Sequence, residues 1–170
     1  MATYELIETI TLGSNAASVT FSDIPQTYTD LKIVISVRST YASTSGILWL
    51  RFNGDSGVNY PFRRLEGSGS AVSSNAATAG QIGIGRTTGS TATANTFSNT
   101  EVYIPNYTGS TYKSVSSTAA SENNAVAAQI TATAGLWNNT SAITSLSVLD
   151  GESSNLVTNS SFSLYGIKKV

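Results

Sequence analysis

Apolar and polar residues alternate with a period of two along most of the chain, which is typical of half-buried β-strands. In the segment Asp30–Arg38 every second residue is leucine, isoleucine or valine, so these residues share one face of a strand. The other runs are rich in β-branched and aromatic residues, which favour strands. The pattern predicts short strands at Tyr4–Leu12, Ser18–Ser22, Asp30–Arg38, Ile47–Asn53, Asn59–Leu65, Gln81–Ile84, Phe97–Ile104, Tyr112–Ala119, Val126–Ala134, Ala142–Leu149 and Ser161–Ile167.

Turn-forming residues separate these runs. Asn53-Gly54 and Asp150-Gly151 each lie between apolar runs, and both predict tight hairpins. No segment has the apolar spacing of an amphipathic helix, so an all-β fold is expected. Residues 1–170 are expected to form a single-domain antiparallel β-sandwich, because each strand must bury one face. A jelly roll is the favoured topology, and another Greek-key sandwich is the alternative.

One long segment departs from the alternation. Apart from Gln81–Arg86, the residues from Gly67 to Ala94 are almost all glycine, serine, alanine, threonine or asparagine. Such a segment has little apolar surface to bury, so residues 67–94 are expected to form a surface loop. This loop and the terminal segments Met1–Tyr4 and Lys168–Val170 are candidates for contacting a neighbouring subunit.

The alternation also predicts which side chains fill the core. These are Leu6, Ile33, Ile35, Val37, Leu48, Leu50, Val102, Ile130, Leu146, Val148, Phe162 and Leu164. A slip of one residue in any strand would exchange its two faces.

Composition excludes several classes of function. The chain has no cysteine and no histidine, which excludes disulfides, thiolate catalysis, histidine-based relays and metal sites built on these ligands. Charged residues are 11% of the chain and the net charge is −1, without the basic patch that nucleic-acid binding needs. The ten acidic residues are scattered without a recognisable catalytic pair. We therefore predict no enzymatic activity, no catalytic residues and no cofactor.

Serine, threonine and asparagine make up 63 of the 170 residues, which predicts a neutral, hydroxyl-rich surface. The first residues lack the basic and apolar regions of a secretion signal. The longest apolar run, Leu31–Val37, contains Lys32 and Ser36 and is too short to cross a membrane. We expect synthesis in the cytoplasm and no membrane partner.

Two polar clusters are candidate sites. The oxygens of Asn53, Asp55 and Asn59 are possible Ca²⁺ ligands, but one carboxylate is few for this ion, and a turn stabilised by side chains is the favoured interpretation. No metal site is therefore predicted. Arg63 and Arg64 point to opposite faces of a strand, and one of them is expected to pair with a carboxylate in its own chain or in a neighbouring subunit.

Aromatic residues are the third group. Trp49 and Trp137 lie in or beside apolar runs and are expected in the core or at its rim. Tyr41, Tyr60 and Tyr107 are candidates for stacking on sugars or filling a pocket in a partner. A sugar-binding surface and an assembly interface both remain open for these tyrosines.

Six passages together resemble a group of small virion proteins of tailed bacteriophages, especially phages of aquatic and cyanobacterial hosts. They run through the whole chain in order and comprise Ala2–Ile7, Ile24–Leu31, Phe52–Tyr60, Glu101–Tyr107, Ala134–Trp137 and Leu164–Lys168. The resemblance implies a structural protein of the virion, without catalytic residues. Related modules occur as head decoration and as domains of tail fibres or appendages.

Within this resemblance, the chain lacks the coiled-coil heptads or repetitive shaft that a separate fibre needs. We therefore expect a capsid decoration or cement protein that binds the major capsid protein as a homo-oligomer, and the resemblance implies a trimer. The alternative is a tail-fibre or appendage module that binds carbohydrate on the host surface.

Overall fold

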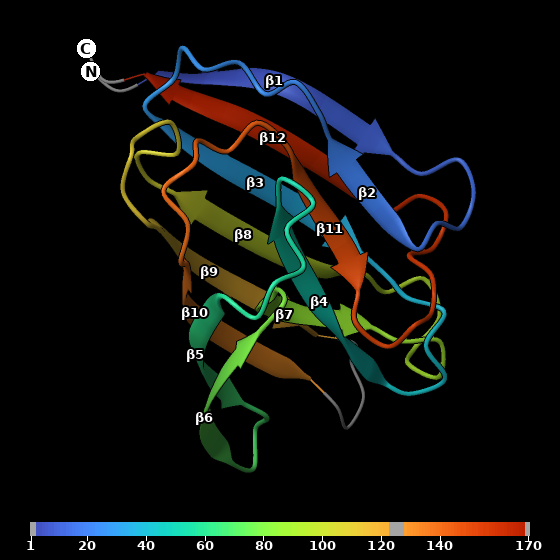
Figure 1. Cartoon of the computed structure of the whole chain (residues 1–170). Helices are drawn as coiled ribbons and strands as arrows, with labels where there is room; N and C mark the ends of the chain where they lie inside the picture. Colours follow the sequence, from blue (N-terminus) through green and yellow to red (C-terminus); the bar gives the residue numbers. More distant parts are fainter. Residues whose placement is uncertain (1–2, 123–127, 169–170) are drawn as a thin grey trace.

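Twelve strands form two antiparallel sheets in the computed structural model, which describes residues 3–122 and 128–168 (Figure 1). No described residue is helical, so the described residues contain no apolar helix that could cross a membrane. The strands are β1 (Thr3–Thr11), β2 (Ser18–Phe21), β3 (Asp30–Val37), β4 (Ser45–Phe52), β5 (Tyr60–Gly67), β6 (Val72–Ala79), β7 (Ile82–Thr88), β8 (Ser98–Ile104), β9 (Lys113–Ser121), β10 (Gln129–Trp137), β11 (Leu146–Asp150) and β12 (Ser161–Lys168).

The two sheets differ in size. The larger has eight strands in the order β1-β12-β3-β8-β9-β10-β5-β6, and the smaller has four in the order β2-β11-β4-β7. They pack face to face as a β-sandwich, which confirms the predicted all-β class. The eight-plus-four arrangement does not by itself establish a jelly roll, so that topology stays a prediction.

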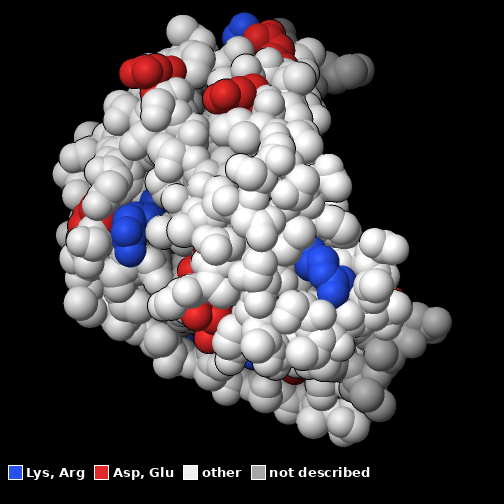
Figure 2. Space-filling model, turned by 90° about the vertical axis from the view of Figure 1, so that its right-hand side faces the viewer, with Lys and Arg blue, Asp and Glu red and all other residues white. Residues whose placement is uncertain are grey.

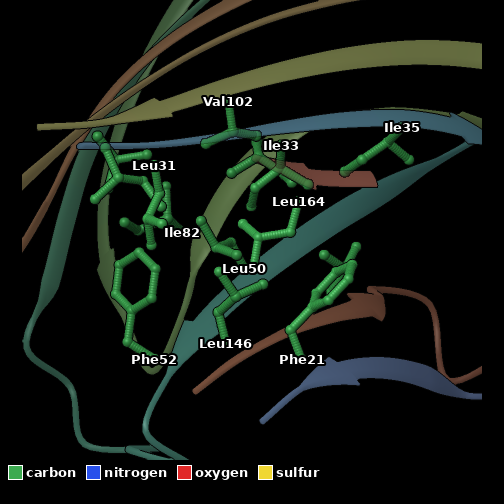
Figure 3. Close-up of a cluster of buried hydrophobic side chains, with 14 of the residues drawn as sticks. Phe21, Leu31, Ile33, Ile35, Leu50, Phe52, Ile82, Val102, Leu146 and Leu164 are labelled. Carbon is green, nitrogen blue, oxygen red and sulfur yellow. The ribbon is translucent and has the colours of Figure 1, made fainter. Parts of the chain in front are cut away.

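The core lies between the sheets (Figure 3). Leu50, Phe52 and Leu146 of the smaller sheet face Ile33 and Leu164 of the larger one, and all five are fully buried. Ten of the twelve side chains predicted for the core are buried. The regular alternation of β3, β4, β8, β11 and β12 explains this agreement.

Leu6 and Ile130 were predicted in the core but are exposed, at 57% and 60%. A β-bulge between Leu6 and Glu8 shifts the register of β1, so Ile7 packs against the core instead. In β10 the inward positions hold Thr131 and Thr133, which leaves Ile130 on the outer face.

The polar inner face of β10 follows from the close approach of β7. A Cβ atom added to Gly85 of β7 would lie 2.5 Å from the Cβ of Ala119 in β9, so the two sheets nearly touch there. Short hydroxyl side chains fill the narrow gap and donate to carbonyls of β7: Ser117 to Ile84 over 2.7 Å and Thr133 to Gly83 over 2.9 Å.

Both predicted hairpin turns instead connect the two sheets. Asn53 and Gly54 have positive φ, and Asp55 N–H donates to the Phe52 carbonyl, so the tight turn forms as expected. However, it leads from β4 to β5, which lie in different sheets, and the turn at Asp150-Gly151 likewise leads from β11 to β12. Burial of apolar faces decides the strand partners, whereas a turn sequence specifies only a local bend.

The expectation that residues 67–94 form a surface loop is also wrong, because most of this segment is β-strand. It contains β6 and β7, and β6 lacks an apolar pattern because residues 72–78 are exposed on both faces. After β7 the chain does form a loop, residues 89–97, which surrounds Arg38. The Arg38 guanidinium donates to the carbonyls of Thr93 and Thr96 over 2.8 and 2.9 Å.

Candidate assembly surface

Strand β6 is one edge of the larger sheet and projects beyond the smaller sheet (Figure 1). It pairs with β5 from Tyr60↔Ala79 to Gly67↔Val72 without a register shift. The turn between them, residues 68–71, is closed by Ser68 N–H donating to the Ala71 carbonyl over 3.0 Å. The strand carries no charge and no proline. It therefore lacks the features by which natural edge strands prevent pairing with other chains.

The opposite edge of the same sheet, β1, has these protective features. It carries the bulge between Leu6 and Glu8, together with the charges of Glu5 and Glu8. Glu5 also forms an ion pair with Lys168 of β12, with 2.9 Å between Nζ and Oε1. The larger sheet thus has one protected edge and one edge open to pairing.

The outer face of the larger sheet has small side chains along its middle. Ser114, Ser116 and Thr118 of β9 and Ala132 and Ala134 of β10 are all exposed there. Larger exposed side chains, Arg63 and Leu65 of β5, stand beside this strip and line a shallow depression of about 400 Å³ with it. White, uncharged residues cover most of the side of the molecule shown in Figure 2, with separate groups of acidic and basic side chains among them. The exposed side chains of the strip along β9 and β10 are uncharged, so this strip offers shape and hydrogen bonding rather than charge.

Arg63 and Arg64 lie on opposite faces of β5, as predicted. Arg63 is exposed on the outer face, whereas Arg64 is buried beside Glu66 on the inner face, with 3.3 Å between Nε and Oε2. Arg86 of β7 binds Glu66 through both carboxylate oxygens, over 2.9 and 3.0 Å. The predicted pairing of one arginine with a carboxylate of its own chain is thus observed for Arg64, and Arg86 joins it across the two sheets.

Burial opposes the charge of this cluster. Desolvation lowers the pKa of the Arg64 guanidinium, the nearby Arg86 charge lowers it further, and Glu66 raises it. The two arginines and one carboxylate lie where β7 meets β5, next to the β5–β6 hairpin. They hold the edge of the smaller sheet against the strand that carries β6.

The tyrosines proposed for sugar or partner contact are mostly inaccessible. Tyr60 is fully buried, stacks on Trp137 with 6.3 Å between ring centroids, and donates to the Asp55 carbonyl over 3.0 Å. Burial raises the pKa of its hydroxyl to about 12. Tyr107 is also fully buried and donates to the Pro25 carbonyl. Both assignments to an exposed binding surface are therefore wrong, because the hydroxyls satisfy loop carbonyls from inside.

Tyr41 is half-buried in the connection between β3 and β4, where its carbonyl accepts hydrogen bonds from Ser43 and Ser90. The hydroxyls of Tyr60 and Tyr107 instead donate to the carbonyls of other segments, Asp55 and Pro25. The three tyrosines therefore do not converge on one patch. Trp137 is buried as expected, and Trp49 lies at the rim of the core.

The Asn53–Asn59 cluster is a network of hydrogen bonds within the protein. Asp55 Oδ2 accepts from Trp137 Nε1 over 2.8 Å and from Asn59 Nδ2 over 2.9 Å, and Oδ1 accepts from Gly57 N–H. These donors lower the pKa of the Asp55 carboxyl, with Asn59 contributing most. The cluster therefore matches the interpretation as a turn stabilised by side chains, and the described residues include no group of three or more histidine, cysteine, aspartate or glutamate side chains that could hold a metal ion.

The hydrophobic pattern did not predict β6, whose residues 72–78 are all exposed at the edge of the larger sheet. Its sequence offered no apolar alternation, since neither face is buried. A weaker signal was present in Ser68-Gly69-Ser70-Ala71, a short glycine-containing turn that follows the well-defined strand β5. Such a turn predicts a returning strand even when that strand is polar.

Comparison with known proteins gives no family assignment. No protein-family model matches the chain, and no curated protein matches it at a significant level.

Proposed function

We propose that this chain is a non-enzymatic structural protein of a phage virion, and that it decorates the head by binding the outer capsid lattice. The observation that carries the proposal is β6, an uncharged eight-residue strand open to pairing at the edge of the sandwich, because it lets copies of the chain assemble while their outer faces remain free to contact the capsid. Edge strands bind partners through main-chain hydrogen bonds and need few charged contacts. The resemblance of the six sequence passages to small virion proteins supports the same role.

In this role the protein clamps neighbouring copies of the major capsid protein after the head has assembled. Many weak contacts suffice, because linked sites raise the effective concentration of each subsequent contact. Binding to the assembled lattice alone stabilises it by mass action. The outer face of β9, with the hydroxyls of Ser114, Ser116 and Thr118, suits a polar, hydrated interface of this kind. Self-association multiplies these contacts.

Removal of the protein from the particle tests the proposal. Phage heads that lack this protein are expected to rupture at a lower temperature than complete heads. When the salt concentration is lowered in steps, they should also rupture earlier, while the ionic strength is still higher. Purified protein added back should restore the original rupture temperature. Heads of unchanged stability, accompanied by loss of adsorption to host cells, would contradict decoration.

A second candidate function, binding of host carbohydrate, is favoured by one observation. Tyr4 and Tyr103 are exposed on the outer face near β1 and β8 and line a depression of about 230 Å³ with Lys32 and Glu101. Exposed tyrosine rings can stack on sugar rings. These are different residues from the tyrosines that the sequence suggested.

A glycan array carrying host polysaccharides tests this second function. Saturable binding that is lost in Tyr4→Ala but kept in Tyr112→Ala would support it, because Tyr112 is equally an exposed tyrosine but does not line this depression. Absence of binding by the unmodified protein would reject it.

A further inference from the structure

We propose that β6 pairs with β6 of a second copy of this chain, antiparallel and about a two-fold axis, to form one continuous sheet. The inference rests on the proposed assembly role and names the partner of its open edge. In an antiparallel sheet, alternate residues of an edge strand direct their N–H and C=O groups away from the sheet. No described segment of the chain covers this side of β6.

The side chains of β6 permit self-pairing. A two-fold axis places the residue on the axis opposite its own copy, so a charge there would face a like charge, and every other residue faces the one equally far on the other side of the axis. β6 has no charged residue and no side chain larger than valine or asparagine. Directly opposed residues of antiparallel strands direct their side chains to the same face of the sheet. The axis must therefore pass through a residue, rather than between two residues, and that residue lies near the middle of the strand. With the axis at Asn75 the paired residues are 72–78, and with the axis at Ala76 they are 73–79.

The sandwich leaves room for the second copy. A two-fold axis perpendicular to the sheet brings both smaller sheets to the same side. They do not meet, because β7 ends the smaller sheet over β5 and β6 extends beyond it. The inward residues Ser73, Asn75 and Ala77 are exposed for this reason.

The pairing closes after two copies. Each chain has one open edge in its larger sheet, because β1 carries a bulge and the Glu5 and Glu8 side chains. Once both β6 strands are paired, the ends of the joined sheet are two copies of β1. The dimer therefore does not continue into a fibre. Val72, which is 75% exposed in the single chain, becomes partly covered at the new junction.

Light scattering after size exclusion, together with hydrogen exchange, tests the inference on the purified full chain. We expect a mass twice that of the 17.7 kDa chain and slow exchange of the β6 amides. The double variant Asn75→Lys/Ala76→Lys places like charges at either possible axis, and should raise the dissociation constant of the dimer roughly tenfold or more. The control Ser114→Lys/Thr118→Lys adds the same charge to exposed positions of the central strand β9 and should remain a dimer.

Several outcomes would overturn the inference. These are a monomeric unmodified chain with fast-exchanging β6 amides, a trimer, or a dimer that the β6 variant leaves intact. The test separates this inference from the decoration role. A monomeric protein that still stabilises phage heads refutes self-pairing alone, whereas a β6 dimer that does not bind heads refutes decoration alone.

Discussion

The indole N–H of Trp137 donates to the Asp55 carboxylate over 2.8 Å, which joins residues 82 positions apart in the chain. Trp137 ends β10, and Asp55 lies in the connection that carries the chain from the smaller sheet to β5. The bond therefore fixes the place where β5 begins. Since β5 is the sole described partner of β6 in the sheet, the same bond helps to orient the open edge.

Replacement of Asp55 by alanine is expected to lower the free energy of unfolding at pH 7 by about 2 kcal/mol, because hydrogen bonds to a charged group are lost and donors are left unpaired. The native pKa of this carboxyl is below its ordinary value of 3.8. The stabilisation of the fold by the ionised Asp55 is therefore complete above pH 3.8 and disappears as the pH falls through the lower native pKa.

Urea unfolding at pH 7 and at pH 2.5 measures this difference. The difference in the free energy of unfolding between the original chain and Asp55→Ala should be smaller at the lower pH. Glu101→Gln is the control, because Glu101 is a surface carboxylate paired with Lys32, for which a change under about 1 kcal/mol is expected. A gap independent of pH would contradict a role for the Asp55 charge.

Replacement of Glu66 by glutamine should destabilise the protein by about 3 kcal/mol, since it leaves Arg64 and Arg86 together without a carboxylate. Arg64→Met should be nearly neutral, because Glu66 keeps its three hydrogen bonds with Arg86 and a buried charge is removed. Arg63→Gln, on the exposed face, is the control. Chemical denaturation measures all three, and equal losses for Glu66→Gln and Arg64→Met would contradict this description of the cluster.

The register of β1 and β12 predicts opposite behaviour for two leucines. Leu164→Ala should cost about 3 kcal/mol because it opens a cavity in the core, whereas Leu6→Ala should change stability by less than about 0.5 kcal/mol. Thermal unfolding provides the measurement. A large loss at Leu6 would mean that the bulge in β1 is wrongly placed.

The close contact of β7 with β9 predicts that Gly85→Ala destabilises the protein by about 1–3 kcal/mol, because the added methyl group overlaps with Ala119. Ala119→Gly in the same chain should recover part of this loss. A double-mutant cycle measures the coupling between the two positions. Independent effects of the two substitutions would show that the sheets are not in contact there.

The sequence predicts eleven of the twelve strands because their apolar residues alternate along the chain. Leu31, Ile33 and Ile35 show this most clearly in β3, where all three are buried. It does not predict the sheet to which each strand belongs, as the turns at Asn53-Gly54 and Asp150-Gly151 demonstrate. That choice depends on contacts between residues far apart in the chain.

The candidate site was harder to predict than the fold. Alternation identified Arg64 as facing away from Arg63, but the partner Arg86 comes from another sheet and has no signal in the local sequence. Tyr60 and Tyr107 follow turn residues in the sequence, yet both rings are buried in the core, where each hydroxyl donates to a loop carbonyl. β6 pairs with β5 through its backbone and reaches the core through Ala79 at its end, so residues 72–78 have no pattern of buried and exposed side chains.

The position of this chain in an image reconstruction of the intact phage particle tests the proposed function most directly. Decoration predicts density for the twelve-stranded sandwich on the outer surface of the head, repeated over the capsid lattice and in contact with the major capsid protein. Density at the tip of a tail fibre, with none on the head, would contradict it.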